Sequence, residues 1–383
     1  MKICFLEIEP VETAYFARKL AAHELLFVDS LVEVPFDVDI VSVFIGSPIG
    51  EAFLEAHPRL KFIATRSTTL DHLDLDACTR RGVAIGRVES YGDHIVAEHT
   101  FALLLAVTKR LREAMEVPRQ SRFSYEGLRG VELRGKTFGI IGAGRIGLHT
   151  IPIARAFGMK VLAHDIAPHP SQAEALGFEY VTFETLLRRS DIISLHAPLT
   201  AETFHLLDRE AFAKCRPGVI MINTARGRLI DTVALLEALD AGIVGGAGLD
   251  VLGEESVFRR DAARVLTDQI LDRLHTAGPA ARPEDERARA EQIEKLICLG
   301  KLLARPNVVF TPHTAFNCIE ALERIDETTV ANINSFINGT LPSASPGSSP
   351  HTRPSDEYCL ASNGGPIRFE TNPHSIHKSA AST

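Results

Sequence analysis

The chain of 383 residues has no long hydrophobic run, no block of basic residues and no paired cysteines. Its longest apolar run, FALLLAV at 101–107, is too short to cross a bilayer, so we expect no membrane association. The triplet TRR at 79–81 reads most simply as a solvated turn. Because the chain has no basic block and a net charge of −8, we expect no nucleic-acid partner. None of the six cysteines lies in a C-x-x-C pair or in a His/Cys cluster with zinc spacing, which predicts no metal site.

The N-terminal segment MKICFLEIEPVETAYF does not resemble a signal peptide. Glu7, Glu9 and Glu12 interrupt it, and no long apolar run precedes a small-residue cleavage site. We therefore expect a cytoplasmic protein.

Short apolar runs alternate with helical segments over the first hundred residues. The expected helices cover 11–20 and 74–82, and the expected strands cover 2–8, 24–28, 39–45, 61–66 and 83–88. This alternation, punctuated by Gly, Pro and Asp, is typical of a buried parallel sheet.

A second series follows a long expected helix at 93–116 and a polar connector. Its expected strands lie at 136–142, 160–165, 191–196, 218–224, 246–251 and 307–312, with helices between them. One amphipathic helix, 315–339, closes the ordered part and ends at Gly339. The pattern predicts an α/β fold of two doubly wound parallel-sheet domains with a cleft between them. The substrate domain would cover 1–98, completed by 313–340, and a Rossmann dinucleotide-binding domain would cover 99–312.

Two segments fall outside this alternation. Residues 254–304 are charged and helix-prone, and we expect two helices broken at AGPAARP, 277–283. The segment reads as a surface elaboration, or alternatively as a subunit contact or a flap over the cleft. Residues 341–383 are rich in Ser, Pro, Gly and Thr, which predicts a disordered tail.

The stretch GIIGAGRIG carries the pattern G-x-G-x-x-G at Gly142, Gly144 and Gly147. It follows an apolar strand and opens a helix, and the next strand ends at Asp165, which is the context that a dinucleotide site requires. These glycines allow a tight turn, close approach of a pyrophosphate and close helix packing, and the helix N-terminus favours phosphate charge. Asp165 can accept from both ribose hydroxyls. No Arg or Lys follows it in DIAPHP, which favours NAD over NADP.

Three further stretches carry charged or titratable side chains near strand ends. NTARGRLID places Arg226 where open α/β sheets bind ligands, and a guanidinium there can hold a carboxylate through two hydrogen bonds. GLDVLGEE contains Asp250 and Glu255, and TPHTAF contains His313. Taken singly, these residues read as a surface arginine, loop or capping acids, and a strand-end histidine.

Taken together and in order, these stretches resemble the D-isomer-specific 2-hydroxyacid dehydrogenase family over about residues 1–340. Arg226, Glu255 and His313 match the catalytic trio of that family, and the glycine motif with Asp165 matches its cofactor site. The segments RSTTLDHLDLDAC, VAEHTFALLLA and DIISLHAPLT also look like family segments.

Within the family, SYGDHIVAEHT and TPHTAFN look most like the D-lactate dehydrogenase branch. Tyr91 and Phe316 match substrate-pocket positions of that branch, and the chain has no Trp, which many other branches carry shortly after the catalytic histidine. One departure is Thr69, where the family usually has Gly in the loop that binds the substrate carboxylate. The long insertion after Gly253 is another.

The resemblance implies reversible reduction of a 2-oxoacid by NADH. Arg226 and the N–H groups of Thr68 and Thr69 would bind substrate, His313 would exchange a proton with it, and Glu255 would raise the pKa of His313. Further implied cofactor contacts are Arg145, Ile146, His196, Ala197, Pro198, Thr224, Ala225 and Asp250.

Pyruvate and D-lactate are the first expectation, because Tyr91 and Phe316 suggest a small, partly apolar pocket. Glyoxylate, hydroxypyruvate or a bulkier 2-oxoacid remains an alternative, and so does an NAD(H)-sensing corepressor-like binding protein. The family resemblance also implies a homodimer that uses the long helix starting near Asp93.

Overall fold

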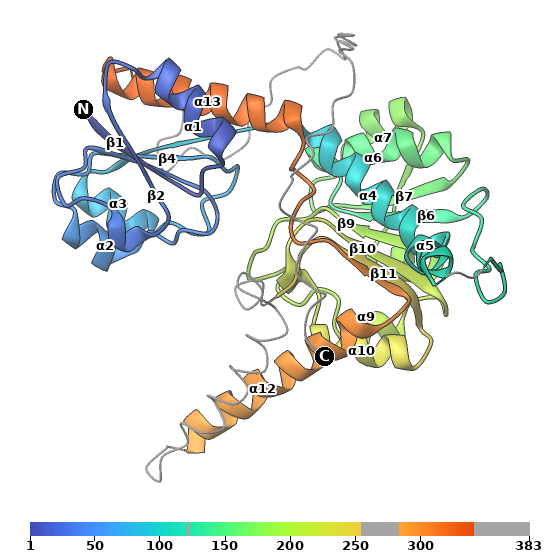
Figure 1. The fold of residues 1–383 in the computed structure, drawn as a ribbon. Helices are drawn as coiled ribbons and strands as arrows, with labels where there is room; N and C mark the ends of the chain where they lie inside the picture. The colour runs from blue at the N-terminus through green and yellow to red at the C-terminus, as the bar shows by residue number, and fades with distance from the viewer. Residues whose placement is uncertain (121–122, 254–282, 341–383) are drawn as a thin grey trace.

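The computed structural model describes residues 1–120, 123–253 and 283–340, the side chains of 283–293 excepted. Two parallel sheets lie on opposite sides of the molecule (Figure 1). The smaller sheet has the order β2-β1-β3-β4-β5. Its strands are β1 Lys2–Leu6, β2 Glu24–Val28, β3 Ile40–Val43, β4 Phe62–Thr65 and β5 Ala84–Arg87. This 2-1-3-4-5 order is the flavodoxin-like order.

Helices cover both faces of the smaller sheet, which explains its continuous apolar strands. Two apolar clusters fill the two sides, one including Leu54 and Ala77 and the other including Phe16 and Ile333. The helices are α1 Pro10–Lys19 and α13 Ile319–Ile337 on one face, and α2 Glu51–Ala56 and α3 Leu75–Arg81 on the other, with a short 3-10 turn at Leu31–Glu33.

The larger sheet has seven parallel strands in the order β12-β11-β10-β9-β6-β7-β8, which is the Rossmann order with one strand added. The strands are β6 Thr137–Ile141, β7 Lys160–His164, β8 Glu179–Tyr180, β9 Ile192–Leu195, β10 Val219–Asn223, β11 Val244–Leu249 and β12 Val308–Phe310.

Helices flank this sheet on both sides as well. Helices α4 Asp93–Thr108 and α6 Arg145–Ala156 pack on one side. The other side carries α8 Phe183–Arg189, α9 Arg209–Ala213, α10 Thr232–Asp240 and α12 Pro283–Ala304. Helix α7 Pro170–Leu176 lies beside β8, and a 3-10 turn forms at Gly227–Leu229.

The helix expected at 93–116 is wrong in one respect, because the chain breaks it in two. Helix α4 ends at Thr108 and α5 runs over Leu111–Arg119. Arg110 between them has a left-handed backbone (φ 51°), and its guanidinium donates to the carbonyl of Gly127. The last helix also starts later than expected, at Ile319 rather than residue 315, because residues 314–318 form turns in which the N–H of Asn317 donates to the carbonyl of Thr314. The short strand β8 escaped prediction, because two residues carry too little pattern.

The insertion is more than a surface elaboration where the structure describes it. Leu296, Leu299 and Leu302 of α12 are buried in the core against α10. Residues 254–282, including most of the expected break at 277–283, lie outside the described residues, as does the predicted tail at 341–383.

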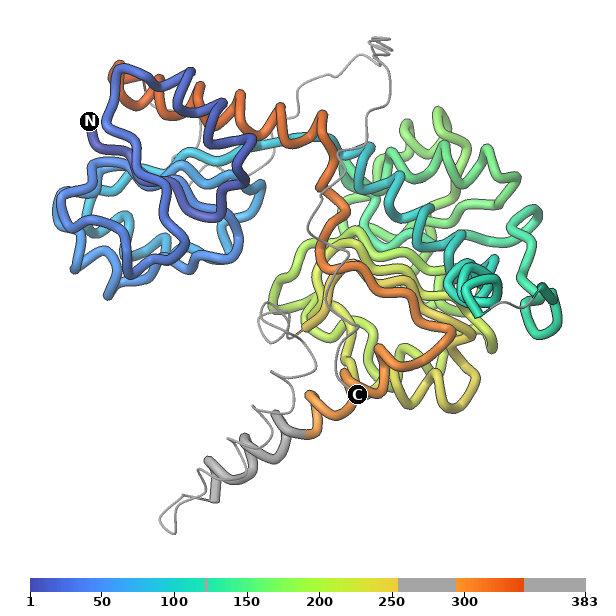
Figure 2. Tube along the Cα trace, in the orientation of Figure 1, coloured from blue at the N-terminus to red at the C-terminus, as the bar shows by residue number. Residues whose placement is uncertain are grey.

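After β12 the chain leaves the larger sheet and crosses to the smaller one as α13 (Figure 2). The predicted return of the chain to its first unit is therefore seen, while the exact domain limits remain predictions. No helix of the described residues is both long and apolar enough to cross a membrane. No cluster that could hold a metal ion occurs in the same part of the chain.

Candidate active site

The glycine turn joins β6 to α6 and matches the shape that a dinucleotide requires. Gly142 has φ 95°, and a Cβ there would lie 2.7 Å from the backbone nitrogen of Ala197. A Cβ on Gly147 would meet the carbonyl of Gly142, so only glycine allows helix and turn to approach so closely. A Cβ on Gly144 would have nothing within 4 Å, so this side of the turn is open to a ligand. These residues fit a pyrophosphate at the N-terminus of α6.

Asp165 stands directly after β7 and is tied to the same turn. Its carboxylate accepts hydrogen bonds from the N–H groups of Ala143 and Ala167, each with a donor–acceptor distance of 2.8 Å. The side chain is half-buried, so it keeps room for further donors.

A pocket of about 220 Å³ opens beside the turn. Its lining residues come from both halves of the molecule: Thr68, Glu89, Tyr91, Gly92, Asp93, Val96, Arg145, Ile146 and His196. Arg145 of α6 forms two hydrogen bonds to Asp93 of α4, of 2.7 and 3.2 Å, and a third to the carbonyl of Glu89.

His196 follows β9 at the edge of this pocket, ahead of the half-buried Ala197 and the exposed Pro198. Its Nε2 lies 2.8 Å from the hydroxyl of Ser194. Its Nδ1 is buried and has no hydrogen-bond partner among the described residues. Burial lowers the pKa of His196 to about 4, so the ring is neutral near pH 7. An unpaired buried nitrogen here is consistent with a cofactor as the missing partner.

Arg226 follows β10 and reaches across to the smaller sheet. Its Nε lies 3.4 Å from a carboxylate oxygen of Asp71, and its Nη1 donates to the carbonyl of Ala225. Before it, Thr224 is buried and its hydroxyl lies 3.0 Å from that of Thr100 on α4. The Arg226 side chain is 30% exposed, so its guanidinium remains accessible to an anion.

His313 lies in a turn held by Asp250. The Asp250 carboxylate is completely buried and accepts from the Thr311 hydroxyl (2.6 Å) and from the N–H groups of Thr314 (2.9 Å) and Ala315 (3.0 Å). Burial acts to raise the pKa of Asp250, but the hydrogen bonds from His99, Thr311 and the two N–H groups outweigh it and lower the pKa. A contact between Asp250 and the nicotinamide stays a prediction.

Phe316 connects the His313 ring to two further aromatic rings. Phe316 lies 6.5 Å from the His313 ring, 6.1 Å from Tyr91 and 5.0 Å from Phe44, as measured between ring centroids. Phe44 was missed from the sequence. Its place directly after β3, at the carboxyl end of a strand, is the signal that could have found it.

Residues 67–69 form a loop after β4, which is called the substrate loop because the sequence predicts that it binds the substrate carboxylate. The Ser67 hydroxyl donates to the carbonyl of Thr69 over 2.7 Å. The N–H groups of Thr68 and Thr69 donate to no acceptor in the described part of the chain. The Tyr91 hydroxyl lies near Thr68, and burial raises its pKa while the nearby charge of Arg226 opposes this. Tyr91 thus links the substrate loop, Arg226 and Phe316. Glu255 lies outside the described residues.

The two parallel sheets and the glycine turn define an α/β protein of the dinucleotide-binding class. Residues 101–315 match the family of D-isomer specific 2-hydroxyacid dehydrogenases in its NAD binding domain. The chain is 35% identical to D-lactate dehydrogenase of Escherichia coli over 329 residues, which cover 85% of this chain and 91% of that one. It is 36% identical to glyoxylate reductase of Thermococcus litoralis over 287 residues, covering 73% and 86% of the two chains.

A crystal structure of D-lactate dehydrogenase from Aquifex aeolicus, complexed with NAD and lactic acid, superposes with a TM-score of 0.73. It shares 33% identity, and the match covers 88% of this chain and 96% of that one. The protein belongs to the D-isomer specific 2-hydroxyacid dehydrogenase family and binds NAD.

Proposed function

We propose that this dehydrogenase interconverts a small 2-oxoacid and its D-2-hydroxyacid, with pyruvate and D-lactate as the first pair. The observation that carries this proposal is the grouping around Tyr91. Its phenol meets Thr68 of the substrate loop and the charge of Arg226, and its ring packs on Phe316 beside His313. A carboxylate binder, a proton-exchanging ring and an apolar wall thus meet in one place.

Arg226 binds the substrate carboxylate and the carbonyl oxygen through its planar fork. The N–H groups of Thr68 and Thr69 hold the other side of the carboxylate. Both residues are half-buried and their N–H groups have no acceptor in the described part of the chain, which leaves the two groups available to a substrate carboxylate. Asp71, which contacts Arg226, must yield when substrate arrives.

His313 donates a proton to the carbonyl oxygen during reduction and takes it back during oxidation. NAD supplies the hydride chemistry when it is bound. Glu255 is proposed to pair with His313 and to favour its charged form. The left-handed backbone of His313 (φ 54°), which a non-glycine residue adopts only at a cost, supports a role for its placement.

The cofactor contacts follow the glycine turn. Gly142, Gly144 and Gly147 with the backbone of Arg145 and Ile146 hold the pyrophosphate, and Asp165 holds the adenosine ribose. His196, Ala197 and Pro198 line the adenine side, while Thr224, Ala225 and Asp250 lie toward the nicotinamide. The unpaired Nδ1 of His196 supports its part in this set.

The aromatic wall favours a small substrate. Phe44 and Tyr91 both pack against Phe316, and such a group of rings leaves little room for a long substrate side chain. The likeness to a glyoxylate reductase favours glyoxylate as the second candidate.

The decisive experiment is a panel of 2-oxoacids at fixed NADH, ranked by kcat/KM. We expect pyruvate to rank first and His313→Ala to abolish turnover. Phenylpyruvate ahead of pyruvate by about tenfold, which is about 1.4 kcal/mol, would exclude the lactate assignment. No turnover with any 2-oxoacid, together with normal NADH binding, would favour a sensing role instead.

We also propose a homodimer formed through α5 and the segment after it, rather than through one long helix. No residue of α5 is buried, and its Leu111 and Met115 are exposed together with Phe123 and Tyr125. An exposed apolar surface of this kind is typical of an interface. The domain limits 1–98 with 313–340 and 99–312, and a cytoplasmic location, are kept as part of this proposal.

A further inference from the structure

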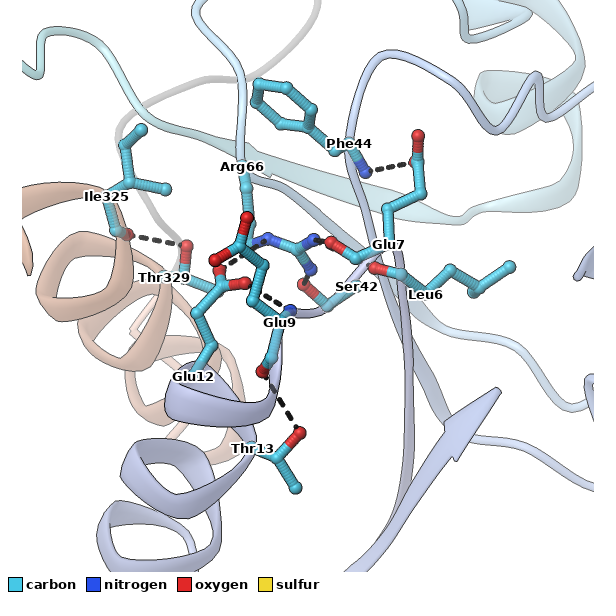
Figure 3. A network of polar contacts seen from close by, with 10 residues as sticks. All are labelled: Leu6, Glu7, Glu9, Glu12, Thr13, Ser42, Phe44, Arg66, Ile325 and Thr329. Atoms are coloured by element: carbon cyan, nitrogen blue, oxygen red, sulfur yellow. Dashed lines mark hydrogen bonds and ion pairs between the residues drawn. The ribbon is translucent and has the colours of Figure 1, made fainter. Parts of the chain in front are cut away.

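A buried guanidinium, that of Arg66, lies at the carboxyl end of the smaller sheet (Figure 3). Arg66 follows β4 directly and is 2% exposed. Its Nη1 donates to the hydroxyl of Ser42 on β3 (3.2 Å), and its Nη2 donates to the carbonyls of Leu6 (2.8 Å) and Glu7 at the end of β1. One side chain therefore ties three neighbouring strand ends together.

Two buried carboxyl groups face this guanidinium from two helices. Glu12 of α1 lies 3.9 Å from the Arg66 Nε and also accepts the N–H of Glu9. Asp326 of α13 is 6% exposed, faces Glu12, and has a buried Oδ1 without a hydrogen-bond partner among the described residues. Such an arrangement is costly unless its charges balance.

The charges balance only if the two acids share a proton. Two carboxylates against one guanidinium would leave one buried negative charge, and two ionised carboxylates in one buried site repel each other. Burial and then the neighbouring Glu12 raise the pKa of Asp326, Arg66 acts against both, and the resulting pKa is about 7. Tyr15 of α1 also faces Asp326, and Glu7 faces Arg66.

Each member of this group continues into a part of the substrate site. Arg66 is followed at once by the substrate loop, 67–69. The carbonyl of Glu7 accepts from Arg66, and its carboxylate accepts the N–H of Phe44 at a distance of 2.9 Å. Asp326 lies on α13, which begins three residues after Phe316 and also holds the carbonyl of Tyr91 through Arg324.

We propose that Arg66, Glu12 and Asp326 form a positioning triad, which fixes the substrate loop against α13 only while Glu12 and Asp326 share one proton. The triad touches neither substrate nor cofactor. It acts through Thr68, Thr69 and Phe44, so it sets the affinity for the 2-oxoacid rather than the rate of the chemical step. This inference rests on the proposed function, because that proposal assigns the substrate loop.

Asp326→Asn tests the triad, since an amide resembles the protonated acid in shape and cannot ionise. We expect the variant to match the wild type in KM for pyruvate near pH 6, where Asp326 is protonated. Near pH 8.5 the wild-type KM should exceed that of the variant by about threefold or more, with kcat within about twofold, because only the wild type acquires a second buried charge. A ratio of the two KM values that stays constant across this range overturns the proposal.

Glu327→Gln is the matched control, because Glu327 is the exposed neighbour on the same helix. It should follow the wild type at every pH, which separates the effect of the triad from any pH effect that all three proteins share. Arg66→Lys, which keeps the charge but loses the fork, should raise KM about tenfold at both pH values.

Thermal unfolding keeps the test independent of activity. An acid whose pKa is raised by folding loses stability as pH rises from its unfolded value, near 3.9, through its folded value. Asp326→Asn escapes this loss, so its melting temperature should rise relative to the wild type between about pH 4 and pH 7.5 and then level off. A difference in melting temperature between the two proteins that does not change with pH would overturn the shared proton. An inactive wild type with the expected melting curves would instead overturn only the proposed function.

Discussion

The backbone N–H of His313 donates to the backbone carbonyl of Asp250 at a distance of 2.8 Å. The Asp250 carboxylate accepts from the N–H groups of the next two residues, Thr314 and Ala315. The turn that carries His313 is therefore built around one buried side chain. Since His313 adopts a left-handed backbone there, the turn must be held by contacts rather than by local preference.

Asp250→Asn should lower both stability and turnover. The amide replaces one acceptor oxygen by a donor that faces other donors, at a cost of about 2 kcal/mol in the free energy of unfolding. Denaturant unfolding and kcat measure the two effects, with the exposed Asp76→Asn as control. Because hydrogen bonds lower the pKa of Asp250, its contribution is present above the unfolded pKa and lost as pH falls through the folded pKa. An equal cost at pH 7 and near pH 2 would contradict this account.

Arg226→Lys should reduce kcat/KM by about a thousandfold, or about 4 kcal/mol, because lysine cannot form the two parallel bonds of a guanidinium. The oxidation of NADH with pyruvate measures the loss. Arg228→Lys is the control, since Arg228 is exposed and donates to the carbonyl of Gly253. Similar losses in both variants would point to a damaged turn and not to a lost carboxylate contact.

Phe44→Ala should widen the substrate site. Removing the ring opposite Phe316 is expected to raise the ratio of kcat/KM for phenylpyruvate over pyruvate by about tenfold. Kinetics on the two substrates measure this ratio, and the exposed Phe36→Ala serves for comparison. If Phe44→Ala leaves the ratio unchanged, the ring does not limit substrate size.

Gly142→Ala should weaken NADH binding by about a hundredfold, since the added Cβ strains the left-handed backbone and meets the segment at Ala197. Titration of NADH fluorescence gives the dissociation constant. Gly242→Ala separates the two causes, because Gly242 also has a positive φ (69°) but nothing within 4 Å. NADH binding that is equally weak in both variants would contradict a role specific to the turn.

Met115→Lys should convert the proposed dimer into a monomer, because a charge at the centre of an apolar interface is left without a partner. Sedimentation velocity over a range of concentrations measures the change. Val11→Lys, at an exposed apolar residue on α1, should leave the assembly intact. A wild-type chain that sediments as a monomer would end the proposal.

Much of the fold could be predicted because parallel strands buried on both faces leave an unbroken apolar run. β2 was predicted to the residue, and the glycine turn and Gly82 at the end of α3 were found from local rules. Local rules failed at Arg110, where a residue other than glycine turns left-handed because its guanidinium has a partner seventeen residues later, at Gly127.

In the candidate site, too, the sequence predicted the residues with a local signal and not those that depend on distant contacts. The order of Gly142, Arg226 and His313 along the chain was enough to suggest chemistry, since each follows a strand at its carboxyl end. Phe44 was not predicted, because no neighbouring residue in the sequence indicates that its ring packs against Phe316.

By itself, the sequence determined the two alternating series of strands and helices, the glycine turn and the family, because these depend on residues that are near each other in the chain. Only the tertiary structure decided that Arg66, Glu12 and Asp326 meet in one buried group. Glu12 and Asp326 are separated by most of the chain, and they face each other because the last helix returns to the first sheet and packs beside α1.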